Sequence, residues 1–219
     1  MAQPHTLIIN FHRIGNPAES HDAGEAGVTV TVAEMHEILD LVGGRSDVRI
    51  TSDDGFRSDI EELAPALASR GLQGEFFILA GRLGEPGSLD DNDVRALHDM
   101  GMRIGTHGWD HIAWRSLDTA AAQHEMVDSC RRIESCGVPG IQSAACPFGT
   151  YGRKTIAQLR VAGIHTIYTS DGGWGSATAT IIPRNSVGSG RTAEWVSQLL
   201  RSPGVSLAQR FKRSIKRWR

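Results

Sequence analysis

The sequence predicts a single-domain parallel α/β barrel, and three features of the chain support that prediction. Segments typical of strands alternate with segments typical of helices almost without interruption, which is the pattern of a parallel α/β fold. The predicted strands number seven, which favours a barrel. The chain has 219 residues, enough to bury one large core, and no internal repeat or low-complexity linker divides it.

The elements follow one another in a regular order along the chain. We expect strands at residues 6–11, 48–52, 74–79, 103–106, 142–146, 165–169 and 180–183. We expect helices at residues 32–42, 60–70, 90–100, 119–136, 153–162 and 193–201. The barrel should therefore occupy residues 1–204, and residues 205–219 should form a basic amphipathic C-terminal helix.

Start and stop signals mark two of these helices. Ser58 and Ser88 precede helical segments as candidate N-caps, and Gly71 and Gly101 follow the same segments. Pro65 falls past the first turn of the first of these helices. Because proline cannot donate the helical hydrogen bond, we expect a kink or a later helix start there.

Composition and charge exclude several classes of protein. Apolar residues make up 40% and charged residues 22%, close to the average for soluble globular proteins. Residues 210–219 hold six of the 23 Lys and Arg residues, which leaves 17 against 25 Asp and Glu in the body. An acidic body argues against a nucleic-acid substrate, since binding a phosphate backbone needs a basic face on the domain.

The location of the protein is predicted from its N-terminus and its cysteines. The sequence has no basic leader followed by a long apolar run, and no apolar stretch approaches the length of a membrane span. Cys130, Cys136 and Cys146 are odd in number and irregularly spaced, unlike a disulfide framework. We therefore expect a cytoplasmic protein with reduced thiols.

Polar residues follow the predicted strands, where parallel α/β folds place their active sites. Asp53 and Asp54 come directly after the strand VRITS, and His107 and His111 follow the strand MRIGT. The segment Pro-Phe-Gly, with Phe148 at its centre, follows the strand QSAAC. Each has an ordinary structural alternative: a turn or helix cap for the aspartates, solvated helix residues for the histidines and a packed turn for the third segment.

The segment HGWDH favours a metal site. An i, i+4 spacing corresponds to one helical turn, so His107 and His111 can both point at one ion. A carboxylate from a neighbouring strand end completes a set of two His and one Asp with an open fourth position, as in catalytic zinc sites. Of the adjacent aspartates, one can bind the metal while the other, displaced by the bend at Gly55, accepts a proton.

TSDDG, HGWDH and CPFGTYG resemble the first three motifs of the polysaccharide deacetylase (NodB-homology, carbohydrate esterase) family, over roughly residues 6–187. The resemblance implies a distorted (β/α)7 barrel that hydrolyses acetamido groups on sugars by attack of metal-bound water. It makes Asp54, His107 and His111 the metal ligands and Asp53 the general base. The backbone N–H of Phe148 would stabilise the tetrahedral oxyanion. The ion expected is Zn²⁺, with Co²⁺, Ni²⁺ or Mn²⁺ as alternatives.

The sequence departs from the family pattern around the base. Ser52 replaces an aromatic or aliphatic residue, a change we expect to affect only packing. Ala145 stands where the family has an arginine that orients the base. Arg184, at the strand end IIPRNSV, is the candidate to supply that charge, although a lone arginine is more often part of a surface ion pair.

The general acid is also missing from its family position, because no Leu-x-His segment follows residue 170. A circularly permuted subset of the family uses an early histidine after a strand, and NFHRI resembles that pattern at His12. The alternative is a buried histidine bonded to a backbone carbonyl. Asp171, which resembles the family aspartate that pairs with the catalytic histidine, would polarise His12. Trp174 either stacks on the sugar or packs, and Cys146 is a weaker candidate ligand.

The basic C-terminal segment has two interpretations. Its apolar residues recur at spacings of four, four and three, on one helical face: Leu207, Phe211, Ile215 and Trp218. A basic amphipathic helix of this kind suits the surface of an anionic membrane, which would favour a lipid-linked sugar at the inner face of that membrane. The alternative is a solvated helix that packs on the barrel.

Three functions remain open at this point. The first is an N-deacetylase acting on an acetamido sugar or a sugar-containing precursor. The second keeps the metal site but cleaves another amide or ester, such as a formamide, a ureide or an O-acetyl group. The third is a catalytically inactive barrel that binds glycans or associates with membranes.

Overall fold

Parallel strands pair in the order in which they follow along the chain. The computed structural model describes residues 5–19, 23–204 and 213–216. The strands are β1 (His5–Phe11), β2 (Val48–Asp54), β3 (Gly74–Ile78), β4 (Arg103–Thr106), β5 (Ser143–Ala145), β6 (Thr166–Thr169) and β8 (Ile181–Pro183). All seven strands expected from the sequence are present.

Two very short strands bring the ends of the sheet together. β8 pairs with β6, and after Arg184 the chain enters β9 (Asn185–Ser186), which pairs in parallel with β1. β7 (Gly175–Ser176) lies antiparallel on β1. The sheet is therefore a nearly closed barrel in a single domain, which confirms the predicted fold class. β7 and β9 were not expected, because two residues carry no recognisable strand pattern.

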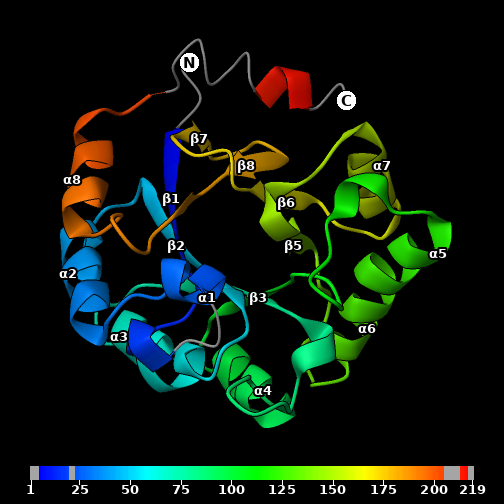
Figure 1. Ribbon diagram of the computed structural model, residues 1–219, viewed down its shortest axis with the longest axis horizontal. Coiled ribbons are helices and arrows are strands. Elements are labelled where there is room, and N and C mark those ends of the chain that lie inside the picture. Colours follow the sequence, from blue (N-terminus) through cyan, green and yellow to red (C-terminus); the bar gives the residue numbers. More distant parts are fainter. Residues whose placement is uncertain (1–4, 20–22, 205–212, 217–219) are drawn as a thin grey trace.

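Helices surround the strands on the outside of the barrel (Figure 1). They are α2 (Val32–Val42), α3 (Ala64–Ala68), α4 (Asp91–Asp99), α5 (Thr119–Ala122), α6 (Ser129–Glu134), α7 (Arg153–Val161) and α8 (Ala193–Arg201). The short helix α1 (Ala23–Val28) lies at the mouth of the barrel instead. Segments with π-helical hydrogen bonding, Asp59–Leu63 and Gln123–Asp128, lead into α3 and α6. The six predicted helical segments are thus present, and α1 is an addition.

The helix starts correct two details of the sequence analysis. Ser58 does not cap its helix, and its hydroxyl accepts a hydrogen bond from the backbone N–H of Ile14 at 3.0 Å instead. Asp90, not Ser88, caps α4 and forms a capping box with Asp93. Pro65 lies inside a continuous helical stretch, directly after the π-helical turn in which the N–H of Ala64 donates to the Asp59 carbonyl oxygen, so the helix does not start later there.

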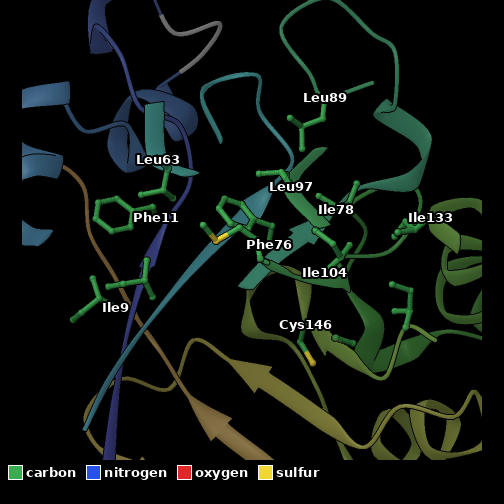
Figure 2. Close-up of a cluster of buried hydrophobic side chains, with 14 of the residues drawn as sticks. Ile9, Phe11, Leu63, Phe76, Ile78, Leu89, Leu97, Ile104, Ile133 and Cys146 are labelled. Atoms are coloured by element: carbon green, nitrogen blue, oxygen red, sulfur yellow. The ribbon is translucent and has the colours of Figure 1, made fainter. Parts of the chain in front are cut away.

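The strands bury side chains on both faces. Their outward residues and the inner faces of the helices form the main core, in which Ile9, Phe76 and Leu97 are fully buried (Figure 2). A second, smaller cluster comprises Ile8, Phe77, Ala145, Tyr168 and Ile182. This alternation is what parallel strands covered on both faces require.

Part of the basic C-terminal segment packs on the barrel. Residues 213–216 are helical; Arg213 donates to the carbonyl oxygens of Trp174 and Gly172, and Lys216 Nζ lies 2.5 Å from an Asp171 carboxylate oxygen. These contacts agree with packing on the barrel. Of the residues expected on the apolar face, Leu207, Phe211 and Trp218 lie outside the described residues. The boundary at residue 204 and a membrane contact therefore remain predictions.

No helix in the part of the chain that the structure describes is long and apolar enough to cross a membrane. The three cysteines are buried and none forms a disulfide.

Candidate metal centre

The candidate site lies at the carboxyl ends of β2 and β4, next to the seam where the barrel closes. Asp54 is the last residue of β2 and has a φ of 75°, in the left-handed region that non-glycine residues rarely adopt. Gly55 follows with a φ of 69°. Such strain, of order 1–3 kcal/mol for a residue, persists where the surrounding fold enforces it, often at functional sites.

The HGWDH segment is a loop, which corrects the expectation that the two histidines share a helical turn. His107 follows β4 directly, Gly108 has a φ of 94° and His111 a φ of 55°. The buried carboxylate of Glu125 holds the loop by accepting hydrogen bonds from the backbone N–H groups of Trp109, at 3.1 Å, and Asp110, at 2.9 Å. The carboxylate replaces the hydrogen bonds that a helix would have supplied internally.

A glycine is required at position 108 for this arrangement. A Cβ added there would lie 2.3 Å from Glu125 Oε2, closer than any side chain tolerates. The indole N–H of Trp114 donates to the same oxygen at 3.1 Å. The loop conformation therefore depends on a carboxylate from the long helical segment that follows β4.

Three potential ligand atoms converge above β2 and β4. Asp54 Oδ1 lies 3.5 Å from His107 Nε2 and 3.6 Å from His111 Nε2, and all three ligand atoms lie within 4.8 Å of one another. Asp54 Oδ1 is buried and has no hydrogen-bond partner among the described residues. An unpartnered buried carboxylate oxygen facing two imidazoles fits a divalent cation.

The two imidazoles are prepared for metal binding in different ways. Nδ1 of His107 lies 2.9 Å from the backbone carbonyl oxygen of Ala145, which fixes the proton on Nδ1 and leaves the Nε2 lone pair for a ligand. Burial lowers the pKa of His111 to about 4, so that imidazole is neutral at pH 7. The ring of His111 lies 4.5 Å, between centroids, from that of Phe148.

Asp53 lies beside this set, and its carboxylate is paired with Arg184. Nη1 and Nη2 of Arg184 donate to Oδ1 and Oδ2 of Asp53, each at 2.6 Å, and Asn10 Nδ2 donates to Oδ2 at 3.2 Å. Burial alone would raise the pKa of Asp53, but the charge and hydrogen bonds of Arg184, together with the nearby His107 and His12, outweigh burial and hold that pKa well below its ordinary value. The carboxylate is therefore ionised and fixed in orientation.

Arg184 reaches Asp53 from the far end of the sequence. It is the residue between β8 and β9, and its side chain is buried, with its guanidinium carbon 5.2 Å from the ring centroid of Phe77. The structure thus places an arginine on Asp53 although position 145 is an alanine. Ser52 differs from its expected role, because its hydroxyl donates to buried Asp59 at 2.7 Å instead of only filling space.

The structure brings His12 to Asp53 and gives Asp171 other partners. His12 Nε2 lies 3.7 Å from Asp53 Oδ2, and His12 Nδ1 is buried without a hydrogen-bond partner among the described residues. Burial lowers the pKa of His12, although the nearby aspartates oppose this. Asp171 accepts hydrogen bonds from Tyr151, at 2.7 Å, Thr169 and Lys216. Asp171 therefore pairs with Lys216 rather than with His12.

A cavity of about 570 Å³ opens above these groups. Its lining includes His12, Asp53, Asp54, His107, His111, Cys146 and Phe148. Phe148 is 65% exposed and has a φ of 55°. Burial raises the pKa of the Cys146 thiol to about 12, which leaves it protonated and a poor ligand. Trp174 is buried and donates its indole N–H to the Leu199 carbonyl oxygen, so it packs.

Sequence reasoning missed several residues that shape the site. Glu125 orders the loop, Asn10 contacts Asp53, and Asp59 lies buried behind Ser52. Asn10 could have been noticed, because it is a polar residue near the end of β1, two positions before His12, which follows the strand directly. No local pattern singles out Glu125, since an acidic residue in a helix is ordinarily solvated.

Fold and site together define an α/β barrel with a candidate Asp-His-His metal centre at the carboxyl ends of its strands. The family model described as polysaccharide deacetylase matches residues 42–167. This is more than half of the chain, which therefore belongs to the polysaccharide deacetylase family, as its motifs indicated. Membership supports a hydrolase.

One curated relative matches at low sequence identity. The "Putative polysaccharide deacetylase YxkH" of Bacillus subtilis (strain 168) is 24% identical over 153 residues, which are 70% of this chain and 55% of that protein. The chain thus spans about half the length of this curated relative.

Two solved structures share the fold. The deacetylase PplD of Streptococcus pyogenes, in complex with acetate, gives a TM-score of 0.79 at 16% identity, covering 90% of this chain and 99% of that chain. A polysaccharide deacetylase from Bacillus cereus gives 0.77 at 14% identity, covering 90% and 69%. At these identities the likeness shows the fold alone.

Proposed function

We propose that the protein is a metal-dependent hydrolase that removes N-acetyl groups from an amino sugar or a sugar-containing precursor. The observation that carries the proposal is the convergence of Asp54, His107 and His111 beside an ionised carboxylate, Asp53. Family membership supports an acetylated polysaccharide or related sugar as the substrate class. Release of acetate agrees with the similarity in fold to the Streptococcus pyogenes deacetylase, which was solved in complex with acetate.

Asp54, His107 and His111 would hold the ion, and their donor set fits Zn²⁺ best, with Co²⁺, Ni²⁺ and Mn²⁺ as alternatives. When bound, such an ion lowers the pKa of a coordinated water to about 7 and polarises a carbonyl oxygen. The protein's part is to hold both imidazoles in the orientation that the ion needs, which the Ala145 carbonyl and the Glu125-ordered loop support.

Asp53 would be the general base. Its Oδ2 lies 4.0 Å from His107 Nε2, close enough to accept a proton from a water at the ligand set. The two hydrogen bonds from Arg184 keep the carboxylate from rotating toward the ion. Adjacent aspartates can then differ in role, because one has a guanidinium partner and the other does not.

His12 would return the proton to the leaving amine. Because burial lowers its pKa, the imidazole is neutral before reaction and must first take up a proton. Asp53, whose Oδ2 is 3.7 Å from His12 Nε2, is positioned to pass on the proton that it accepts. The backbone N–H of Phe148, at the rim of the cavity, would donate to the oxyanion. Asp171, which the sequence suggested as the partner of His12, would take no direct part, because its carboxylate is held by Tyr151 and Lys216.

A catalytically inactive barrel is a weaker interpretation. The alanine at position 145 suggested a base without a partner, but Arg184 supplies two hydrogen bonds to Asp53. The predictions of a membrane contact through Leu207, Phe211, Ile215 and Trp218, of a lipid-linked sugar and of a cytoplasmic location remain expectations from the sequence.

Metal analysis combined with acetate release tests the proposal. The purified protein should retain about one divalent ion per chain and release acetate from N-acetylated sugars only when that ion is present. A panel that includes O-acetyl, formamido and ureido sugars identifies the bond that is cleaved. A protein that binds no divalent metal and hydrolyses none of the panel would contradict the proposal.

The role of His12 has its own test. His12→Ala should lower kcat by about 10²–10⁴-fold, the usual contribution of general acid–base catalysis, while leaving the metal content unchanged. His36→Ala is the matched control, because His36 lies on α2 outside the cavity lining. Near-normal turnover of His12→Ala across the pH range would refute the assignment.

A further inference from the structure

The cavity above the ligand set carries cationic groups that the deacetylation chemistry does not use. Arg82 and Arg191 both line it. Every carboxylate of the lining already faces a partner: Arg184 contacts Asp53, Arg13 lies 3.2 Å from Glu25, and Asp54 faces the two ligand histidines. Among the described residues, neither Arg82 nor Arg191 has a carboxylate partner. The lining thus has two guanidinium groups without a carboxylate partner among the described residues.

Arg82 is positioned by the same loop that carries the histidines. It ends the 3₁₀ turn Ala80–Arg82, in which the N–H of Ala80 donates to the Gly108 carbonyl at 2.9 Å. The N–H of Gly81 donates to the Trp109 carbonyl at 3.1 Å. A Cβ at position 81 would lie 2.7 Å from that oxygen, so only glycine allows this approach. The backbone that leads to Arg82 is therefore held against the loop that carries His107 and His111.

Arg191 comes from the opposite end of the chain. It lies in the loop after β9, and this loop is joined to α1 by a hydrogen bond from the N–H of Ser189 to the carbonyl oxygen of Gly27 at 3.0 Å. Its guanidinium carbon lies 5.8 Å from the ring centroid of Trp195. Stacking on an aromatic face leaves the N–H edge of a guanidinium available for an anion.

We propose that the substrate carries an anionic group, a phosphate or a carboxylate, near the acetamide, and that Arg82 and Arg191 bind it. This inference rests on the proposed function and narrows its substrate class. Guanidinium groups bind carboxylate and phosphate oxygens through charge-assisted, often bidentate hydrogen bonds. A neutral sugar would leave both cations partly desolvated and unpaired when it covers them, which costs free energy.

The test compares three monosaccharides that share the same acetamide. N-acetylglucosamine is neutral, N-acetylglucosamine 1-phosphate carries a phosphate, and N-acetylmuramic acid carries a carboxylate. We expect kcat/KM for acetate release to be at least about tenfold higher for one or both anionic sugars than for the neutral one. The anionic sugar that is preferred identifies the group. In Arg82→Gln and Arg191→Gln this ratio should fall toward one.

The ratio is a suitable readout because any loss of metal or of folded protein lowers both kcat/KM values alike. Arg160→Gln is the control, since Arg160 is an exposed residue of α7 outside the cavity lining, and it should keep the wild-type ratio. Calorimetric titration of the metal-free protein with the same sugars gives a second readout, of binding without turnover. The preferred anionic sugar should bind at least about tenfold more tightly, and Arg82→Gln should remove the difference.

Two results overturn the inference. The first is a wild-type protein that hydrolyses and binds the neutral sugar as well as both anionic sugars; acetate release from the neutral sugar would then leave the proposed function intact. The second is an anionic preference that Arg82→Gln and Arg191→Gln both retain in full. Absence of acetate release from all three sugars counts against the proposed function instead, and the calorimetric comparison still decides whether the arginines bind an anion.

Discussion

The part of the chain that matches the family model and the parts that flank it contribute different things to the site. Residues 42–167 contain the three candidate ligands, Asp53 and Phe148. The flanks supply His12 and Arg184, whose side chains lie against Asp53. The matched segment therefore holds the groups that would bind the ion, and the flanks hold the groups that set the charge and proton affinity of the base. A family can keep the groups that bind the ion while it varies the groups around the base.

The largest effect should come from a ligand in the matched segment. We expect Asp54→Asn to weaken metal binding by more than the roughly 100-fold that is typical when a residue that only orients a ligand is removed. Asparagine tolerates the left-handed backbone at this position, so the fold should survive. Metal content after dialysis and acetate release measure the effect. Retention of one ion with near-normal turnover would remove Asp54 from the ligand set.

Arg184→Gln should show that the flanks act on the base and not on metal binding. Without the guanidinium, burial raises the pKa of Asp53, so the acidic limb of the pH–rate profile should move to higher pH. We expect kcat to fall by about 10²-fold or more while the metal content stays the same. Steady-state kinetics between pH 4 and pH 9 and metal analysis check both parts.

Stability provides the control for this variant. Removing one partner of a buried ion pair leaves an unpaired charge and costs about 3–5 kcal/mol. The double variant Asp53→Asn/Arg184→Gln should recover part of that loss, because neither group remains charged. If Arg184→Gln leaves both stability and the pH profile unchanged, the pairing does not orient the base.

The sequence identified the residues of the matched segment that converge in the structure, and it identified the contacts from the flanks only in part. Asp53, Asp54 and the two histidines stand at strand ends in consecutive motifs, so a local pattern is sufficient to find them. The Arg184–Asp53 contact joins residues 131 positions apart, and only the closing of the barrel brings them together. The predicted helical turn of HGWDH was wrong for a similar reason, since the loop conformation depends on Glu125, sixteen residues beyond Trp109. Strand and helix positions, set by local periodicity, were predicted closely.

Glu125→Gln tests the contribution of Glu125 to the conformation of the HGWDH loop, within the matched segment. The amide keeps the size of the side chain but loses the charge that strengthens hydrogen bonds from two backbone N–H groups and an indole. We expect metal affinity to fall by about 10–100-fold, as for other residues that orient ligands. Competition with a chelator measures the affinity, and Glu134→Gln, in the following helix, is the control. An unchanged affinity would mean that the loop holds its shape without this carboxylate.

The smallest effect should come from Asp59, a buried carboxyl that has no cationic partner among the described residues. Its oxygen accepts a hydrogen bond from Ser52, and burial raises its pKa well above the ordinary value, the opposite of Asp53. A carboxyl whose pKa is raised in the folded state destabilises the fold as pH rises above the unfolded pKa, because the unfolded chain ionises more readily.

Asp59→Asn removes this penalty, since the amide cannot ionise. We expect a gain of about 1 kcal/mol or more at pH 7, or roughly 2–4 °C in Tm, that shrinks toward pH 4. Thermal unfolding of metal-free protein at both pH values measures the gain, with exposed Asp99→Asn as the control. A gain that is equal at pH 4 and pH 7 would show that ionisation of Asp59 carries no such penalty. The opposite pKa shifts of Asp59 and Asp53 could then not be explained by the presence of Arg184 at Asp53 alone.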